Sequence, residues 1–169
     1  MTAYKTMPYH LETERLILRP WAESDAAELR DLVAERGKGA LTVESVRADI
    51  VEMLGATERN GIALLPVQRK AEGDFIGYCG LIIGRSTLEE PEIAYELFRR
   101  VHNNGYATEA GRAVLQAAAA TGRQRLWSTI GTWNMPSLRV IEKLGFERDR
   151  VEVEEKAGEV AWFTRMLSR

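Results

Sequence analysis

Residues 92–120, EIAYELFRRVHNNGYATEAGRAVLQAAAA, constrain the fold of this chain more than any other stretch. Residues 92–97 have a strand pattern, and an apolar stripe at helical spacing begins at Ala107 and continues through Ala110 and Val114. A short connector rich in Asn and Gly joins the two. The first N–H groups of a helix lack intrahelical partners, and the helix dipole adds partial positive charge there. The stretch therefore predicts a strand–loop–helix unit, and its helix start is either a site for a phosphate-like anion or an ordinary capped helix start.

Length, charge and cysteine content narrow the class of protein. The 169 residues fit one domain, residues 1–169, and the net charge of −2 gives no basic field for nucleic acid or a membrane surface. The one cysteine, Cys79, lies in an apolar run, and we expect it in the core. No apolar run approaches the roughly 20 residues of a membrane helix, and the first ten residues do not resemble a signal peptide. We expect a soluble cytoplasmic protein.

The remaining elements follow from periodicity and capping residues. Ser24 and Asp25 can begin one helix, Thr42 can cap a second, and Asn134 can cap a third that has Pro136 in its first turn. Strand patterns cover residues 11–21, 62–68, 75–83, 92–97, 126–130, 146–153 and 160–167. The order predicts an α/β (α+β) fold with a mixed, mostly antiparallel sheet of about seven strands, covered by helices.

Four motifs resemble one known family. EIAYELFRRVHNNGYATEA is similar to the acyl-CoA motif of the GCN5-related N-acetyltransferases (GNAT), although NNGYATEA lacks the ends of a Walker loop or a dinucleotide fingerprint. TERLILRPW, FIGYCGL and NMPSLRVIEKLGFE resemble other elements of the RimJ/RimL-like branch, in the expected order from Thr13 to Phe146. The resemblance implies the GNAT acyl-CoA N-acyltransferase fold, with helices on both faces of the sheet.

The resemblance also implies acetyl-CoA as cosubstrate. The pantetheine arm would lie along the strand that ends at Leu97, with Leu97 and Arg99 as main-chain contacts and a strand N–H near Leu97 polarising the thioester carbonyl. Asn134 would lie near the acetyl end. The residues that would bind the pyrophosphate are Asn103, Asn104, Gly105, Tyr106 and Ala107, and Ser137 is a further expected cofactor contact. The basic side chain of Lys143 either binds the nucleotide phosphates or is a surface charge.

Two positions depart from the family pattern. His102 and Asn103 stand where Gln or Arg and then Gly are usual, and Asn tolerates the left-handed conformation that the loop needs. Ile141 stands where many members have a tyrosine that protonates the leaving thiolate. Ser137, one turn after Asn134, is the alternative donor, unless it only satisfies the helix start.

Two carboxylates are candidates for the general base. Glu92 and Glu96 lie four residues apart and hence on one face of a strand, and either can assist deprotonation directly or through water. The alternative for each is a solvated or ion-paired strand residue. Trp133, beside Asn134, is the aromatic residue that we expect in the acceptor cleft. His10 and His102 are far apart and the chain has no cysteine cluster, so we expect no metal.

The sequence therefore predicts an N-acetyltransferase that moves the acetyl group of acetyl-CoA to a primary amine by direct attack. The branch resemblance suggests a protein N-terminal α-amine as acceptor. A small-molecule amine acetyltransferase and a non-catalytic acyl-CoA sensor stay open as alternatives. So does the oligomeric state, with a homodimer as one option.

Overall fold

The computed structural model describes residues 4–37, 39 and 41–167 of the chain. Its helices are α1 (Ala26–Ala34), α2 (Val43–Asn60), α3 (Tyr106–Ala120) and α4 (Met135–Lys143), with short 3-10 helices η1 (Glu23–Asp25) and η2 (Arg99–Val101). Its strands are β1 (Leu11–Glu12), β2 (Leu16–Leu18), β3 (Leu64–Arg69), β4 (Phe75–Ile82), β5 (Glu92–Leu97), β6 (Arg125–Gly131), β7 (Glu147–Glu154) and β8 (Gly158–Met166). None of these helices is both long and apolar enough to cross a membrane.

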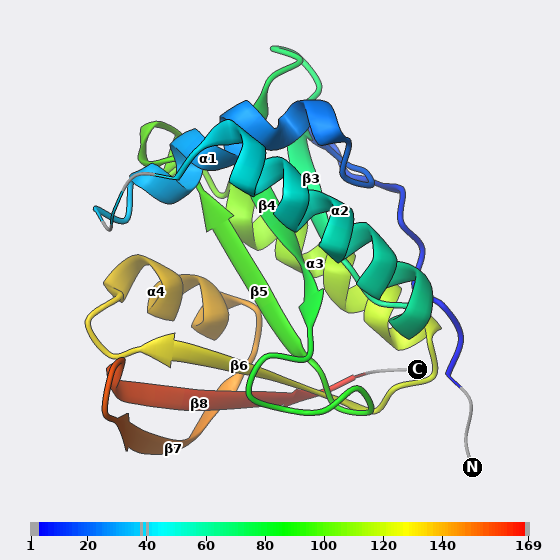
Figure 1. The fold of residues 1–169 in the computed structure, drawn as a ribbon. Coiled ribbons are helices and arrows are strands. Elements are labelled where there is room, and N and C mark those ends of the chain that lie inside the picture. The colour runs from blue at the N-terminus through cyan, green and yellow to red at the C-terminus, as the bar shows by residue number, and fades with distance from the viewer. Residues whose placement is uncertain (1–3, 38, 40, 168–169) are drawn as a thin grey trace.

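The strands form one mixed sheet in the order β1-β2-β3-β4-β5-β6-β8-β7. All neighbouring pairs are antiparallel except β5 and β6, which confirms the predicted fold class. The helices α1 and α2 pack on one face with a core around Trp21 and Ile50, and α3 and α4 pack on the other around Val114 and Ile141 (Figure 1). We call these the α1/α2 face and the α3/α4 face. Cys79 lies in the core, where burial raises its pKa to about 12.

One predicted strand is wrong, and this accounts for the eighth strand. Residues 11–21 do not form a single strand but the two short strands β1 and β2, which pair with each other. The turn between them is bound by Glu109 in the first turn of α3. Its carboxylate accepts hydrogen bonds from Thr13 Oγ1 (2.5 Å), the Arg15 N–H (2.9 Å) and Arg15 Nε (2.7 Å). A distant helix therefore shapes this turn, and local periodicity gives no sign of it.

The parallel pair β5–β6 is joined at one point only. Glu92 is the one residue of β5 with a register partner in β6, namely Trp127. Beyond that point the two strands diverge, so that a wedge opens in the middle of the sheet (Figure 1). The diverging strands expose main-chain groups that a neighbouring strand would otherwise bind.

Two of the predicted helix caps are confirmed. Thr42 Oγ1 accepts from the Ser45 N–H at 3.0 Å, and Asn134 Oδ1 accepts from the Ser137 N–H at 3.3 Å. Asp25 does not cap α1 with its side chain. Instead its carboxylate binds Arg19 through two 2.8 Å hydrogen bonds and accepts from the Ala22 N–H.

The Asp25–Arg19 pair predicts a pH-dependent stability. Burial alone would raise the pKa of Asp25, but the hydrogen bonds from Arg19 and Ala22 outweigh it and leave this pKa below its usual value. We expect Asp25→Asn to lower the free energy of unfolding at pH 7 by about 2 kcal/mol. The contribution is complete above the unfolded-state pKa of about 3.9 and is lost as pH falls through the lower folded-state pKa. In urea unfolding, the difference in the free energy of unfolding between wild type and Asp25→Asn should therefore shrink below about pH 4. A difference that stays constant with pH would contradict the assignment.

Candidate active site

The loop before α3 leaves the helix N-terminus open. Asn103 and Gly105 have positive φ angles of 65° and 78°, as the sequence predicts for this loop. Asn104 Nδ2 donates to the carbonyls of Val101 (3.0 Å) and His102 (3.1 Å), so this side chain folds back onto its own loop. No side chain of the described residues caps α3. The N–H groups at the start of α3 are thus available to an anion, and hydrogen bonds from the loop's own Asn104 stabilise the loop.

Two arginines beside this loop do not stand out in the sequence. Arg15 Nη2 donates to the Asn104 carbonyl at 2.9 Å, and the Arg15 guanidinium lies 4.3 Å from the centre of the Tyr106 ring. Arg69 approaches the same ring at 6.0 Å. Arg15 also pairs with Glu109, so the TERL and ATEA motifs meet at this site. The only sequence signal for this contact was that both motifs resemble motifs of the same family.

The main chain of β5 faces the wedge at alternate residues. At one end the Trp127 N–H donates to the Pro91 carbonyl across to β6, and at the other the Phe98 N–H donates to Ile76 in β4. Alternation along the strand therefore directs the N–H and carbonyl groups of Tyr95 and Leu97 into the wedge. The Leu97 carbonyl accepts a hydrogen bond from His102 Nε2 at 3.0 Å, which leaves the Leu97 N–H as the available group.

The structure does not bring two of the expected cofactor residues to the wedge. The Arg99 N–H donates to Glu35 Oε1 (3.0 Å) and its guanidinium donates to the Glu35 carbonyl (2.7 Å). Lys143 lines a separate hollow of about 390 Å³, which it shares with Arg112 and Arg165 near the far ends of α3 and α4.

A cavity of about 230 Å³ lies where β5 and β6 begin to diverge. Three of the predicted site residues line it, namely Glu92, Asn134 and Ser137, whereas Glu96 does not. Its lining includes residues from both faces of the sheet, because Glu92 binds Thr129 on the α1/α2 face while Tyr95 binds Ser137 of α4 on the α3/α4 face. Its walls also include Tyr95, Thr129 and Gly131.

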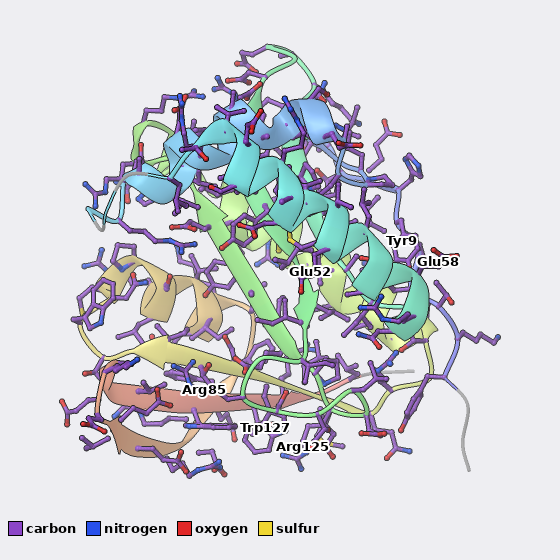
Figure 2. The ribbon with its side chains drawn as sticks, viewed as in Figure 1. Tyr9, Glu52, Glu58, Arg85, Arg125 and Trp127 are labelled. Carbon is purple, nitrogen blue, oxygen red and sulfur yellow. The ribbon has the colours of Figure 1, made fainter. Side chains whose placement is uncertain are left out.

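Glu92 is held by hydrogen bonds at the floor of this cavity. The residue is buried, at 3% exposed, and Oε1 accepts from the Thr129 N–H (3.1 Å) and the Thr129 hydroxyl (2.6 Å). Oε2 accepts from the Arg85 N–H, and a Cβ on Gly84 would overlap it. The Arg85 side chain binds Thr129 in β6 and Glu154 in β7, and it lies over the β6–β8 part of the sheet (Figure 2). This network fixes the carboxylate relative to both strands.

Glu96 has a different environment. Its carboxylate forms a bidentate ion pair with Arg36 and accepts from the Tyr78 hydroxyl at 3.1 Å. Burial raises the pKa of Tyr78 well above its usual range, so this phenol stays protonated and donates. The ion pair between Glu96 and Arg36 therefore links the segment just after α1 to β5.

The helix α4 contributes the other side of the cavity. The Ser137 carbonyl accepts from the Tyr95 hydroxyl at 2.7 Å, while the Ser137 hydroxyl forms no hydrogen bond to any described residue. Burial raises the pKa of Tyr95 far above its usual value. Ile141 is buried in the core and does not reach the cavity. Tyr95 was missed from the sequence because its place beside α4 depends on how the two strands diverge.

Comparison with known proteins identifies the class that this fold and site define. Residues 15–147 match the family model described as acetyltransferase (GNAT) domain. The chain is 30% identical over 151 residues to YoaA of Bacillus subtilis (strain 168), an uncharacterized N-acetyltransferase, which covers 83% of this chain and 84% of YoaA. The chain belongs to the GNAT family. It is an acetyltransferase whose cosubstrate, like that of the family, is acetyl-CoA.

Solved structures share the fold at low sequence identity. RimL, a ribosomal alpha-N-protein acetyltransferase in complex with coenzyme A, superposes with a TM-score of 0.79 at 15% identity, covering 95% of this chain and 97% of RimL. MccE, a self-immunity acetyltransferase in complex with acetyl-CoA and AMP, gives a TM-score of 0.80 at 16% identity, covering 96% and 98%. No group of three His, Cys, Asp or Glu side chains in the described part of the chain is placed to hold a metal ion.

Proposed function

We propose that this chain transfers the acetyl group of acetyl-CoA to a primary amine by direct attack inside the β5–β6 wedge. The observation that carries the proposal is the cavity itself. It has a fixed carboxylate, Glu92, on one side, and on the other the hydroxyl of Ser137, to which no residue in the described part of the chain is hydrogen-bonded. The open N-terminus of α3 lies at the opposite end of β5, where it would bind the cofactor's pyrophosphate.

The geometry supports a direction for the cofactor. The pyrophosphate would lie on residues 103–107, and the pantetheine arm would run back along β5 and pair with Leu97 and then Tyr95. The five residue steps from Leu97 to Glu92 span roughly 17 Å. The thioester would then reach the cavity near Tyr95. On this path the N–H that polarises the thioester carbonyl belongs to Tyr95, and the Leu97 N–H binds the arm nearer the phosphates.

The chemistry needs one proton to leave the amine and one to reach the sulfur. The neutral amine attacks the thioester carbon, and the tetrahedral intermediate collapses with cleavage of the C–S bond. Glu92 takes the ammonium proton, directly or through one water. Ser137 donates a hydrogen bond to the leaving thiolate, which water then protonates. Glu96 is the weaker candidate for the base because Arg36 already neutralises it.

Two acceptor classes stay open in this proposal. RimL supports a protein N-terminal α-amine, and the AMP in the MccE complex supports a small molecule. The cytoplasmic location and a single domain over residues 1–169 stay part of the proposal.

Acetyl-CoA turnover with a panel of amines tests the proposed function. Thiol release should require an amine, and mass spectrometry should find that amine acetylated. Binding of acetyl-CoA without thiol release from any amine would support a non-catalytic sensor instead.

Replacing Ser137 by Ala should have a modest effect. A thiol has a pKa near 8.5, so the thiolate lies within roughly 2 kcal/mol of its neutral form at pH 7 and needs little help to leave. We expect Ser137→Ala to lower kcat about three- to tenfold with an unchanged KM for acetyl-CoA. Steady-state kinetics would measure this, with Ser45→Ala at the distant start of α2 as the control. A loss of more than about 1,000-fold would show that Ser137 is a required general acid.

A further inference from the structure

We infer that Trp133 forms an aromatic subsite for the acceptor, and that the acceptor is a primary amine with an aromatic ring a few bonds from its nitrogen. This inference rests on the proposed function and adds a substrate class to it. Trp133 is 76% exposed although it directly precedes Asn134, which lines the cavity. An indole left in water beside a cavity is a surface that a ligand can cover.

The indole packs at a defined position on the sheet. A Cβ on Gly131 would overlap Nε1, Cδ1 and Cε2 of Trp133, so the ring lies directly against the Gly131 backbone. Only glycine leaves room for this contact. One side of the ring is thus held by β6 while the rest stays open, and Gly131 itself lines the cavity.

The position on the sheet separates Trp133 from the cofactor. Along β6, Leu126 and Ile130 are buried in the core of the α3/α4 face. Gly131 and Thr129 alternate with them and point to the α1/α2 face, where Thr129 binds Glu92. The indole above Gly131 therefore lies on the α1/α2 face. The loop that would bind the pyrophosphate belongs to α3 on the other face, so the open indole faces an acceptor that approaches Glu92.

The spacing sets the length of the acceptor. Thr129 and Gly131 are two residues apart on one strand, which places them about 7 Å from each other. An amine at the Glu92–Thr129 end would carry its ring about 7 Å away, on a spacer of two to four carbons. Arylalkylamines have this shape, and so does the α-amine of a peptide that begins with an aromatic residue.

Matched amines test the inference with the full-length protein. The pair 2-phenylethylamine and 2-cyclohexylethylamine differs in aromaticity at equal spacing, and n-butylamine lacks the ring. The tripeptides Phe-Gly-Gly and Ala-Gly-Gly distinguish a peptide source from a free amine. We expect wild type to favour the aryl member of each pair in kcat/KM by about three- to tenfold. The reason is that the interaction free energy between two aromatic rings exceeds what their buried area alone provides.

The variants assign that preference to one residue. Trp133→Ala should lose about tenfold in kcat/KM for aryl amines and less than about twofold for n-butylamine, with the KM for acetyl-CoA unchanged, and Trp133→Phe should keep most of the preference. Equal losses for all amines, a rise in the KM for acetyl-CoA, or no aryl preference in wild type would overturn the inference while leaving transfer intact. If acetyl-CoA binds but no amine releases thiol, the proposed function fails and this inference with it.

Discussion

Replacing Glu92 by Gln is expected to lower kcat about 100- to 1,000-fold at pH 7, the usual effect of removing a general base. The loss should be greatest where the acceptor is mostly an ammonium ion. A lysine-like amine has a pKa near 10.4 and costs about 4.6 kcal/mol to neutralise at pH 7, whereas an α-amine near 7.8 costs about 1 kcal/mol. Steady-state kinetics over a pH series would measure the loss.

The pH series separates a base from a structural carboxylate. Glu92 also binds the Arg85 N–H and Thr129, so Gln at this position would place an amide N–H against the Arg85 N–H and disturb the floor of the cavity. If Glu92 is the base, the difference in kcat between wild type and Glu92→Gln disappears as pH approaches the pKa of the acceptor, because the neutral amine then forms without a base. A gap that does not change with pH would assign Glu92 a purely structural role. Glu96→Gln is the matched control, and we expect it to cost less than about fivefold because Arg36 already neutralises Glu96.

Replacing Gly105 by Val should raise the Kd for acetyl-CoA at least about 100-fold. Gly105 has φ +78°, a left-handed conformation that a β-branched residue adopts only with strain of about 1–3 kcal/mol. Relief of that strain would turn the first N–H groups of α3 away from the pyrophosphate. Isothermal titration calorimetry would measure the change in Kd.

A second glycine gives the control for this variant. Gly158 has a similar φ of +71° at the start of β8, and a Cβ there would meet nothing within 4 Å. Gly158→Val should lose comparable stability in thermal unfolding but bind acetyl-CoA like wild type. If both variants bind acetyl-CoA equally well, the loop conformation does not govern cofactor binding.

Much of the fold follows from local sequence signals. The order of strands and helices, the caps at Thr42 and Asn134 and the left-handed residues before α3 all come from short-range patterns, and the structure confirms them. Two expectations fail, the cap at Asp25 and the single strand over residues 11–21. The strand breaks because of a contact from Glu109, 94 residues beyond Arg15 in the sequence.

The electrostatics of the site could not be predicted in the same way. Spacing places Glu92 and Glu96 on one face of β5, but it does not show that Arg36 neutralises one of them and that Thr129 and Arg85 fix the other. These partners come from separate elements that meet only in the folded chain. The two carboxylates thus look equivalent in the sequence and differ in the structure, where only Glu92 lines the cavity.

The central claim is that the start of α3 binds a diphosphate and thereby places a thioester in the β5–β6 wedge. Calorimetric titration with acetyl-CoA, compared with acetylated pantetheine that lacks the nucleotide and its phosphates, tests this most directly. The structure predicts clear binding of acetyl-CoA and a loss of at least about 100-fold for the phosphate-free compound. Equal affinity for the two compounds, or no heat and no thermal stabilisation with acetyl-CoA, would contradict it.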